Sequence, residues 1–203
     1  MLARIWSAAI VGIEAVPVAV EVDVSPGLPA TVVVGLPDTA VQESKERVKA
    51  AIKNAGFVFP IKRIVVGLAP ADLRKEGPSF DLAIALGILA GSEQVEPALL
   101  GDHLFLGELS LDGSLRPVAG VLPIAATAQA MGMKGLIVPA ANAAEAAIAT
   151  AVPTYGLHSL TEVVAFLSEP EKFAPVTKPE FPTGAPTTPP RDLKEVKGHQ
   201  QAR

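Results

Sequence analysis

The chain has 203 residues, no cysteine and a formal net charge of −4. Without cysteine it can form no disulfide and no zinc–thiolate site, and its small acidic charge excludes a polycation built along its whole length for nucleic acid. No apolar run reaches the ~18 residues of a membrane span, and the N-terminus lacks the pattern of a secretory signal. We therefore expect a cytoplasmic protein with no membrane partner.

Strand-like and helix-like segments alternate along residues 1–169, and this alternation predicts an α/β fold. A hairpin is expected between 104 and 115, around the turn dipeptide Asp112–Gly113. The predicted strands are 3–11, 16–24, 31–34, 63–68, 135–138 and 152–155. The predicted helices are 39–55, capped by Asp38 or Thr39 and closed by Gly56, and then 80–90, 120–132, 142–150 and 160–167.

Motifs that bind phosphates or metals are absent from the sequence. Neither GxxxxGK[ST] nor GxGxxG occurs, and the three histidines are scattered without metal-ligand spacing. We therefore expect no cofactor and no metal to be bound by these 203 residues.

The C-terminal part differs in composition, since residues 170–203 hold seven of the 19 prolines. Such a segment cannot bury enough apolar surface to offset the entropy of ordering it, so it predicts an extended linker. Beyond the linker, residues 191–203 read like the opening of a helix. A disordered C-terminal tail is the alternative interpretation.

The most specific stretch is residues 68–82, LAPADLRKEGPSFDL, where a strand runs into a loop and then a buried helix. Here the chain resembles the proteolytic domain of Lon-type proteases, whose nucleophilic serine follows Gly-Pro at the start of such a helix. Ser79 stands at that position, and residues 107–113, GELSLDG, match a hairpin of the same family. Where that family has its lysine base, this chain has Leu122.

Leu122 argues against peptidase activity, because a serine hydroxyl needs an adjacent base and leucine cannot accept a proton. Lys75 lies four residues before Ser79, but in a charged loop its ammonium would stay protonated. We therefore expect no catalytic residue and interpret Ser79 as a helix N-cap and Asp81 as a first-turn helix charge. A Lon-like serine peptidase with an unusual base is the alternative.

A closer resemblance covers about residues 1–168 and resumes at 192–203. Residues 35–48, GLPDTAVQESKERV, together with 69–82, resemble the ComM/YifB family of magnesium-chelatase-like AAA+ ATPases. The resemblance implies a Lon proteolytic domain-like (ribosomal S5 domain 2-like) mixed sheet with packed helices over 1–168. It further implies a proline-rich linker over 169–191 and the start of a truncated AAA+ module over 192–203.

The same resemblance implies that the parent protein is a hexameric helicase that drives DNA branch migration during natural transformation. ATP and Mg²⁺ would be bound by the ATPase module, and this chain would be a non-catalytic N-terminal domain for ring assembly, DNA contact or both. Its implied partners are its own AAA+ module, neighbouring subunits and DNA. A free-standing interaction domain is the alternative.

Charge is segregated along the chain. Residues 43–63 hold six basic and two acidic residues, whereas 76–115 hold seven acidic residues and no lysine or arginine. A solvated helix face, a head-to-tail subunit contact and a phosphate-contacting strip all agree with this pattern. The residues predicted to contact DNA or a neighbouring subunit are Lys45, Arg47, Lys49, Lys53, Arg74 and Lys75.

Overall fold

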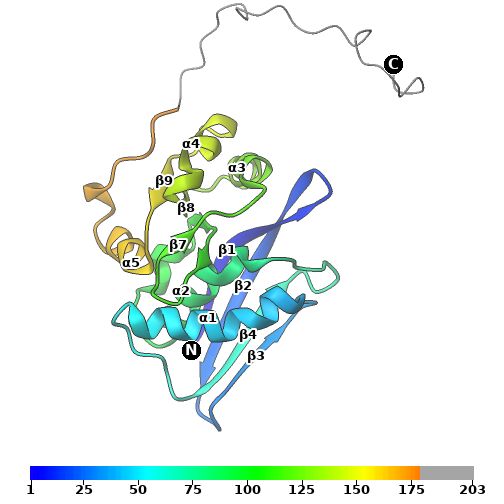
Figure 1. Cartoon of the computed structure of the whole chain (residues 1–203), viewed down its shortest axis with the longest axis vertical. Coiled ribbons are helices and arrows are strands. Elements are labelled where there is room, and N and C mark those ends of the chain that lie inside the picture. Colours follow the sequence, from blue (N-terminus) through cyan, green and yellow to red (C-terminus); the bar gives the residue numbers. More distant parts are fainter. Residues whose placement is uncertain (179–203) are drawn as a thin grey trace, which may run out of the picture.

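A seven-stranded mixed sheet runs through the computed structural model, which describes residues 1–178 (Figure 1). The strands are β1 (Leu2–Val11), β2 (Glu14–Ser25), β3 (Ala30–Val34), β4 (Arg63–Ala69), β5 (His103–Phe105), β6 (Glu108–Leu109), β7 (Leu115–Arg116), β8 (Gly135–Pro139) and β9 (Thr154–Leu157). The α-helices are α1 (Thr39–Asn54), α2 (Asp81–Gly91), α3 (Val121–Ala130), α4 (Ala140–Ala149) and α5 (Leu160–Ser168). Short 3-10 turns are η1 (Pro78–Phe80), η2 (Pro97–Leu100) and η3 (Pro170–Lys172).

The order of strands in the sheet is β3-β4-β2-β1-β5-β8-β9, and β6 and β7 form a separate hairpin. β2 pairs antiparallel with β1 and with β4. The pairs β3–β4, β1–β5, β5–β8 and β8–β9 are parallel. The predicted mixed α/β class is therefore confirmed. The predicted hairpin around Asp112–Gly113 is present as β6 and β7, but it is shorter than predicted, because β5 pairs with β1 and β8 in the large sheet.

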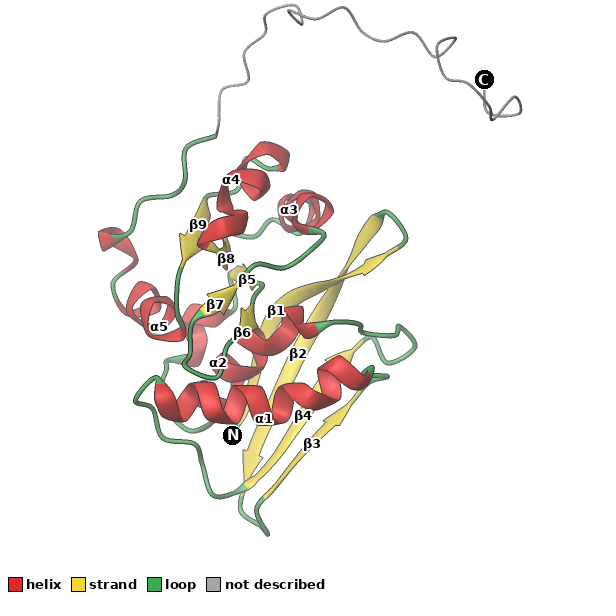
Figure 2. Ribbon diagram, viewed as in Figure 1, coloured by secondary structure: helices red, strands yellow, loops and turns green. Residues whose placement is uncertain are grey.

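Helices α1 and α2 lie on one face of the sheet beside β1–β4, and α3, α4 and α5 lie around β8 and β9 (Figure 2). Successive strand residues point to opposite faces, and in β5 Phe105 belongs to one core cluster while Leu104 belongs to the other. The first cluster includes α1, α2 and α5, and the second includes α3 and α4. Every residue of α2 is buried, and a Cβ at Gly87 would lie 2.4 Å from Val22, so glycine allows this helix to lie directly on β2.

The first helix, α1, follows the predicted amphipathic pattern. Asp38 caps it, since its carboxylate accepts the Val41 N–H at 2.8 Å. Gly56 has a φ of 86°, and the Phe57 N–H bonds the Ile52 carbonyl at 3.0 Å, so the helix ends in a left-handed glycine turn. The buried stripe consists of Val41, Ser44, Val48, Ala51 and Ile52.

Several predicted boundaries differ from the structure. The last strand is Thr154–Leu157 rather than 152–155, and α2 has no side-chain cap, so the interpretation of Ser79 as an N-cap is wrong. Residues 169–178 lie against the sheet unit: Phe173 packs edge-on against Phe166, with ring centroids 5.6 Å apart, and the Val176 N–H bonds the Thr154 carbonyl at 2.7 Å. The predicted linker beyond 178 and the predicted ATPase start at 192–203 lie outside the described residues.

No helix within residues 1–178 combines the length and the apolarity that crossing a bilayer requires.

Candidate functional site

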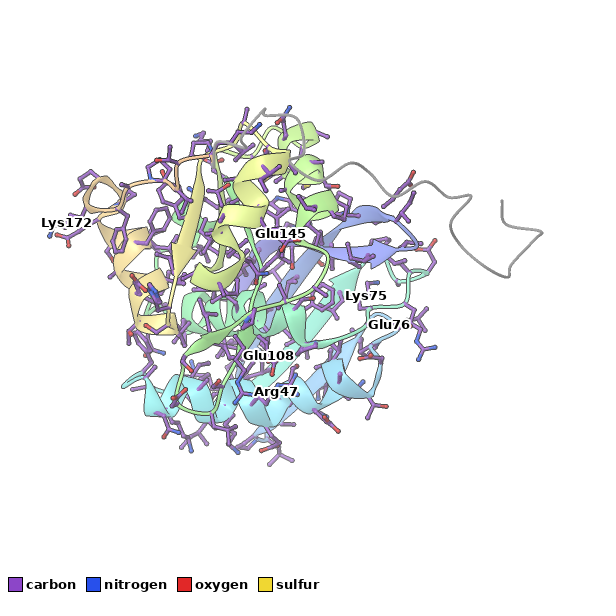
Figure 3. The ribbon with its side chains drawn as sticks, turned by 45° about the horizontal axis from the view of Figure 1, so that its top comes forward. Arg47, Lys75, Glu76, Glu108, Glu145 and Lys172 are labelled. Carbon is purple, nitrogen blue, oxygen red and sulfur yellow. The ribbon has the colours of Figure 1, made fainter. Side chains whose placement is uncertain are left out.

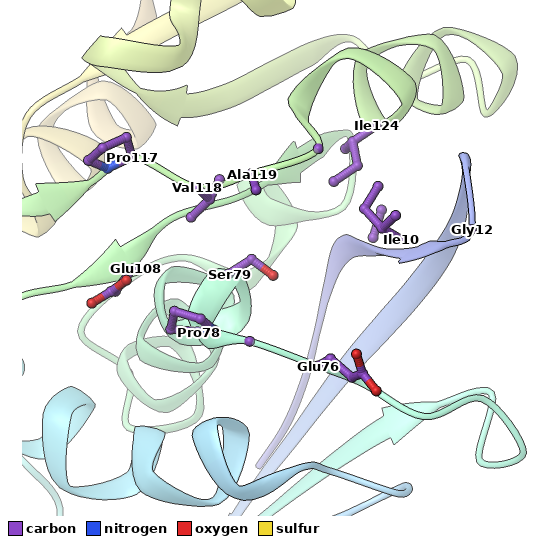
Figure 4. Close-up of a pocket in the computed structure, with 13 residues that line it drawn as sticks. Ile10, Gly12, Glu76, Pro78, Ser79, Glu108, Pro117, Val118, Ala119 and Ile124 are labelled. Atoms are coloured by element: carbon purple, nitrogen blue, oxygen red, sulfur yellow. The ribbon is translucent and has the colours of Figure 1, made fainter. Parts of the chain in front are cut away.

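A cavity of about 570 Å³ opens beside Ser79, between the β1–β2 hairpin and the start of α3 (Figure 4). This volume is in the range of pockets that hold small molecules or peptide side chains. The lining residues come from four segments of the chain: Ala8, Ile10 and Gly12; Glu76, Gly77, Pro78 and Ser79; Glu108; and Pro117, Val118, Ala119, Gly120 and Ile124.

Backbone hydrogen bonds hold Ser79 at this cavity. The Ser79 carbonyl accepts the Gly107 N–H at 3.1 Å, and the Gly107 carbonyl accepts the Leu82 N–H at 3.1 Å. These bonds fix η1 against the segment between β5 and β6. Figure 4 shows the Ser79 side chain pointing toward the space in front of Ile10.

The titratable side chains that line this cavity are both carboxylates. Glu76 lies 3.2 Å from the Arg74 guanidinium and Glu108 lies 3.8 Å from that of Arg116. Among the described residues that line the cavity there is no lysine or histidine, and Leu122, on α3, is not one of them. The Ser79 hydroxyl therefore has no basic nitrogen beside it in the cavity.

Lys75 departs from the sequence prediction, which placed it in a charged loop as a contact for DNA or a neighbouring subunit. The structure buries this side chain completely, and its ammonium donates to the carbonyls of Pro70 and Leu73. Burial lowers the pKa of Lys75, while the charge of Asp72 opposes that shift. The predicted DNA or subunit contact at Lys75 is therefore contradicted, because the residue does not reach the surface.

Arg47 is half-buried, and its guanidinium is paired with a buried carboxylate. Its guanidinium donates to both carboxylate oxygens of Asp81, at 2.8 and 3.0 Å, and to the Ala40 carbonyl at 3.0 Å. Asp81 is fully buried and also accepts the Leu109 N–H at 3.2 Å. Asp81 is a first-turn residue of α2, as predicted, but it is buried there. Arg47 therefore connects α1 to α2 and, through Asp81, to β6 (Figure 3).

The environment of Asp81 changes its acidity. Burial raises the pKa of Asp81 from 3.8 to about 6, and the Arg47 guanidinium and the Leu109 N–H oppose that rise. The same pairing raises the pKa of Arg47, which stays charged. A charged pair therefore lies directly beneath the loop that carries Ser79.

Three of the predicted contact residues remain on the exposed side of α1. Lys53 and Lys49 are exposed, and Lys45 is half-buried. Lys45 and Lys49 meet Lys62 at a hollow of about 200 Å³, which lies between α1 and the start of β3. The hollow is lined by Pro29, Ala30, Thr31, Lys45, Glu46, Lys49, Phe59, Pro60 and Lys62.

The lysine hollow, defined by Lys45, Lys49 and Lys62, is lined by three ammonium-bearing side chains and by one carboxylate, that of Glu46. The Lys49 ammonium lies 5.9 Å from the centre of the Phe59 ring, a cation–π distance that limits where this charge can move. Lys62 was not among the predicted contact residues, but it lines the hollow together with Phe59 and Pro60, from the segment 55–62 between α1 and β4.

Arg74 is exposed and pairs with Glu76 at 3.2 Å, so it lies at the rim of the Ser79 cavity and does not line the lysine hollow. The six predicted contact residues therefore divide into separate environments. Within residues 1–178, the structure contains no group of three or more histidine, aspartate or glutamate side chains arranged to hold a metal ion.

Comparison with known proteins identifies relatives across the whole chain. Residues 20–142 match the family described as subunit ChlI of Mg-chelatase. Competence protein ComM of Haemophilus influenzae is 45% identical over 177 residues, covering 87% of this chain and 35% of its own length. An uncharacterized protein of Mycobacterium tuberculosis is 39% identical, covering 100% of this chain and 40% of its own length.

Protein YifB of Salmonella typhimurium is 40% identical over 202 residues, covering 100% of this chain and 39% of its own length. The chain thus spans well under half of the length of these curated relatives.

Proposed function

The chain belongs to the ChlI family of Mg-chelatase subunits, among its ComM/YifB members, and on this premise we propose that it is the non-catalytic N-terminal domain of a ComM-type AAA+ ATPase. We propose for it the Lon proteolytic domain-like (ribosomal S5 domain 2-like) variety of α/β fold. Its mixed sheet, and the position of Ser79 at the start of a buried helix, support this assignment.

The proposed absence of peptidase activity is supported by the chemistry of the Ser79 cavity. A serine nucleophile transfers its proton to a base within hydrogen-bond reach. The ammonium of Lys75 is bonded to the carbonyls of its own loop, and Leu122 offers no nitrogen. The carboxylates of Glu76 and Glu108 are each paired with an arginine, Arg74 and Arg116 respectively, and no hydrogen bond joins either of them to Ser79 among the described residues.

The proposed contact with DNA is carried by one observation, the convergence of Lys45, Lys49 and Lys62 on the lysine hollow. Lysines bind the phosphates of DNA largely without regard to sequence, and each neutralised phosphate releases counterions. The domain would thus hold the DNA backbone while the rest of the longer protein acts on it. A role of this kind agrees with branch migration, which must proceed through any sequence.

The rest of the proposed assembly lies in the part of the relatives that this chain does not cover. ATP and Mg²⁺ would be bound there by the AAA+ module, six subunits would form a ring, and the whole would drive branch migration during natural transformation. The name of the Haemophilus influenzae relative, competence protein ComM, supports this role.

A contact between neighbouring subunits is the second candidate for the lysine hollow. It is favoured by the opposite charges of the two surfaces, lysines at the hollow and carboxylates at the Ser79 cavity, because head-to-tail packing would bring unlike charges together. The two candidates differ in what the same lysines bind.

The test is the salt dependence of DNA binding by the 203-residue chain, measured by fluorescence anisotropy with a labelled duplex. The double variant Lys45→Glu with Lys49→Glu is expected to bind at least about ten-fold more weakly, with the salt slope reduced by about 2. Lys134→Glu is the control, since Lys134 is exposed, pairs with Asp102 and does not line the hollow. Equal binding by all three proteins would refute the DNA contact, and light scattering on the same samples would reveal a subunit contact.

A further inference from the structure

Two aliphatic side chains are almost fully exposed at the end of the sheet that borders the lysine hollow. Leu28 is 88% exposed in the turn between β2 and β3, and Ile61 is 85% exposed in the segment before β4. β3 and β4 are parallel and begin together, with Ala30 opposite Arg63, so each of these side chains precedes the same residue pair by two positions. The loops that carry them therefore meet at one end of the sheet, the lower end in Figure 2.

The turn that carries Leu28 lies against the start of β4. A Cβ added at Gly27 would lie 3.4 Å from the Cβ of Arg63, so the backbone of the turn is in contact range of that side chain. Pro29 follows Leu28, and a proline restricts the backbone of the residue before it. Leu28 is thus presented next to an exposed arginine, on a turn with little freedom to rearrange.

The segment before Ile61 is anchored to the domain. The Gln94 side chain accepts the Val58 N–H at 2.9 Å and donates to the Val58 carbonyl at 2.8 Å. Phe59 packs against the main core cluster, and Pro60 is buried. Ile61 is therefore an exposed side chain on a fixed backbone, and little further ordering is needed when it contacts a ligand.

Positive charge lies around these two aliphatic side chains. Their sequence neighbours Pro29 and Pro60 both line the lysine hollow, and Lys62 and Arg63 follow directly on Ile61 and are exposed. Apolar side chains among cations complement a ligand that carries negative charge outside and apolar surfaces inside. DNA has this arrangement, since its charged phosphates surround a stack of bases.

Exposed aliphatic side chains can open that stack. Proteins that bend DNA insert leucine, isoleucine or similar side chains between adjacent bases, which partly unstacks the step and kinks the duplex. The cost of unstacking is offset by contacts with the DNA backbone, and the lysine hollow supplies positive charge for them. The cost is least where pairing is already broken, as at a mismatch.

We propose that Leu28 and Ile61 form an aliphatic wedge, which enters between adjacent bases of DNA whose backbone is held at the lysine hollow. This inference rests on the proposed DNA contact of the hollow and adds a local opening of the base stack to it. The wedge works at any sequence, because it contacts the faces of the bases and does not read their edges by hydrogen bonds. The domain would thus distort the DNA that it holds.

The test uses the 203-residue chain and a short DNA duplex with 2-aminopurine beside a central mismatch, since this base fluoresces more strongly when it is unstacked. Saturation with the unaltered chain is expected to raise the fluorescence at least about two-fold. The double variant Leu28→Ser with Ile61→Ser is expected to bind within about three-fold of the unaltered affinity, measured by anisotropy, and to lose most of the rise. Because both side chains are exposed, serine at these positions leaves the core intact.

Ile13→Ser is the matched control. Ile13 is 91% exposed in the β1–β2 turn, at the opposite end of β2 from Leu28, and this variant is expected to keep both the binding and the fluorescence rise. DNA that is bound without a rise, or an equal rise with the double serine variant, would overturn the wedge and leave the lysine contact standing. Binding that survives Lys45→Glu with Lys49→Glu would refute the lysine contact instead, and a chain that binds no duplex would overturn both.

An anionic lipid surface is the other ligand that combines negative charge with an apolar interior. Co-sedimentation with vesicles of phosphatidylcholine and phosphatidylglycerol in equal parts separates it from DNA. The unaltered chain is expected to remain in the supernatant, as is the double serine variant. Sedimentation of the unaltered chain that the double variant loses would assign the two side chains to lipid and overturn the wedge.

Discussion

The Ser79 cavity and the lysine hollow are two concave surfaces of one domain with opposite chemistry. The cavity has apolar walls and two carboxylates, whereas the hollow has three lysines and one glutamate beside an aromatic ring. Helix α1 connects them, because Lys45 and Lys49 face the hollow while Arg47 turns inward to Asp81 beneath the cavity. The difference teaches that neighbouring basic residues on one helix can serve separate purposes, a surface contact in one case and support of a loop in the other.

The largest expected effect comes from breaking the connection between these surfaces. Asp81→Ala leaves the Arg47 guanidinium and the Leu109 N–H without their acceptor, and it is expected to lower the free energy of unfolding by about 3 kcal/mol. Urea denaturation at neutral pH measures the loss. Replacing both partners, Arg47→Met with Asp81→Leu, is expected to cost less, since no buried charge is left alone. A loss below about 1 kcal/mol for Asp81→Ala would contradict the supporting role.

A second effect is the dependence of stability on pH. The pKa of Asp81 is raised from 3.8 to about 6 in the folded state, so between these values the folded chain binds this proton more tightly than the unfolded chain. The free energy of unfolding should therefore fall as the pH rises from about 4 to about 6, by up to about 3 kcal/mol, and level off above. Urea denaturation across this range, compared with Asp81→Asn, isolates the contribution. Parallel curves for the two proteins would be inconsistent with a titrating Asp81.

A smaller effect on the free energy of unfolding distinguishes two residues that were both predicted to be helix caps, Asp38 and Ser79. Asp38 accepts the Val41 N–H at the start of α1 and the Gly77 N–H of the loop leading to Ser79, so Asp38→Ala is expected to lower the free energy of unfolding by about 2 kcal/mol. Ser79→Ala is expected to change it by less than about 0.5 kcal/mol, because Ser79 caps no helix. Equal losses for the two variants would restore the capping role of Ser79.

The smallest expected effect is the reaction of Ser79 with a fluorophosphonate probe, for which we expect no labelling above that of the Ser79→Ala variant. The hydroxyl has no basic nitrogen among the described residues that line the cavity. Mass spectrometry of the treated protein measures the adduct. A stoichiometric adduct on Ser79 would contradict the proposed absence of peptidase activity.

Much of the fold follows from local signals in the sequence. The apolar spacing of α1, the cap at Asp38 and the turn at Gly56 are properties of adjacent residues, and the structure confirms all three. The site depends on contacts between distant segments. Arg47 meets a partner 34 residues away, and helical spacing gives the face on which a residue lies but not the group it meets there.

Lys75 shows even more clearly that contacts between distant segments do not follow from the local sequence. Its local sequence is charged and typical of an exposed loop, but the Lys75 N–H bonds the Leu36 carbonyl and the Asp38 N–H bonds the Lys75 carbonyl, at 3.1 and 3.0 Å. These bonds join the loops before α1 and before η1 and enclose the side chain. A basic residue was therefore buried by a pairing of loops for which the sequence offers no periodic signal.

The central claim is that DNA meets the lysine hollow and not the Ser79 cavity. The most direct measurement is a titration of the ¹⁵N-labelled chain with a short DNA duplex at low salt, followed by the amide resonances of both surfaces. We predict shifts at residues 29–31, 45–53 and 59–63, which diminish as salt is added, and none at residues 8–12 and 117–120. Shifts centred on the Ser79 cavity, or none at the lysine hollow, would contradict the account.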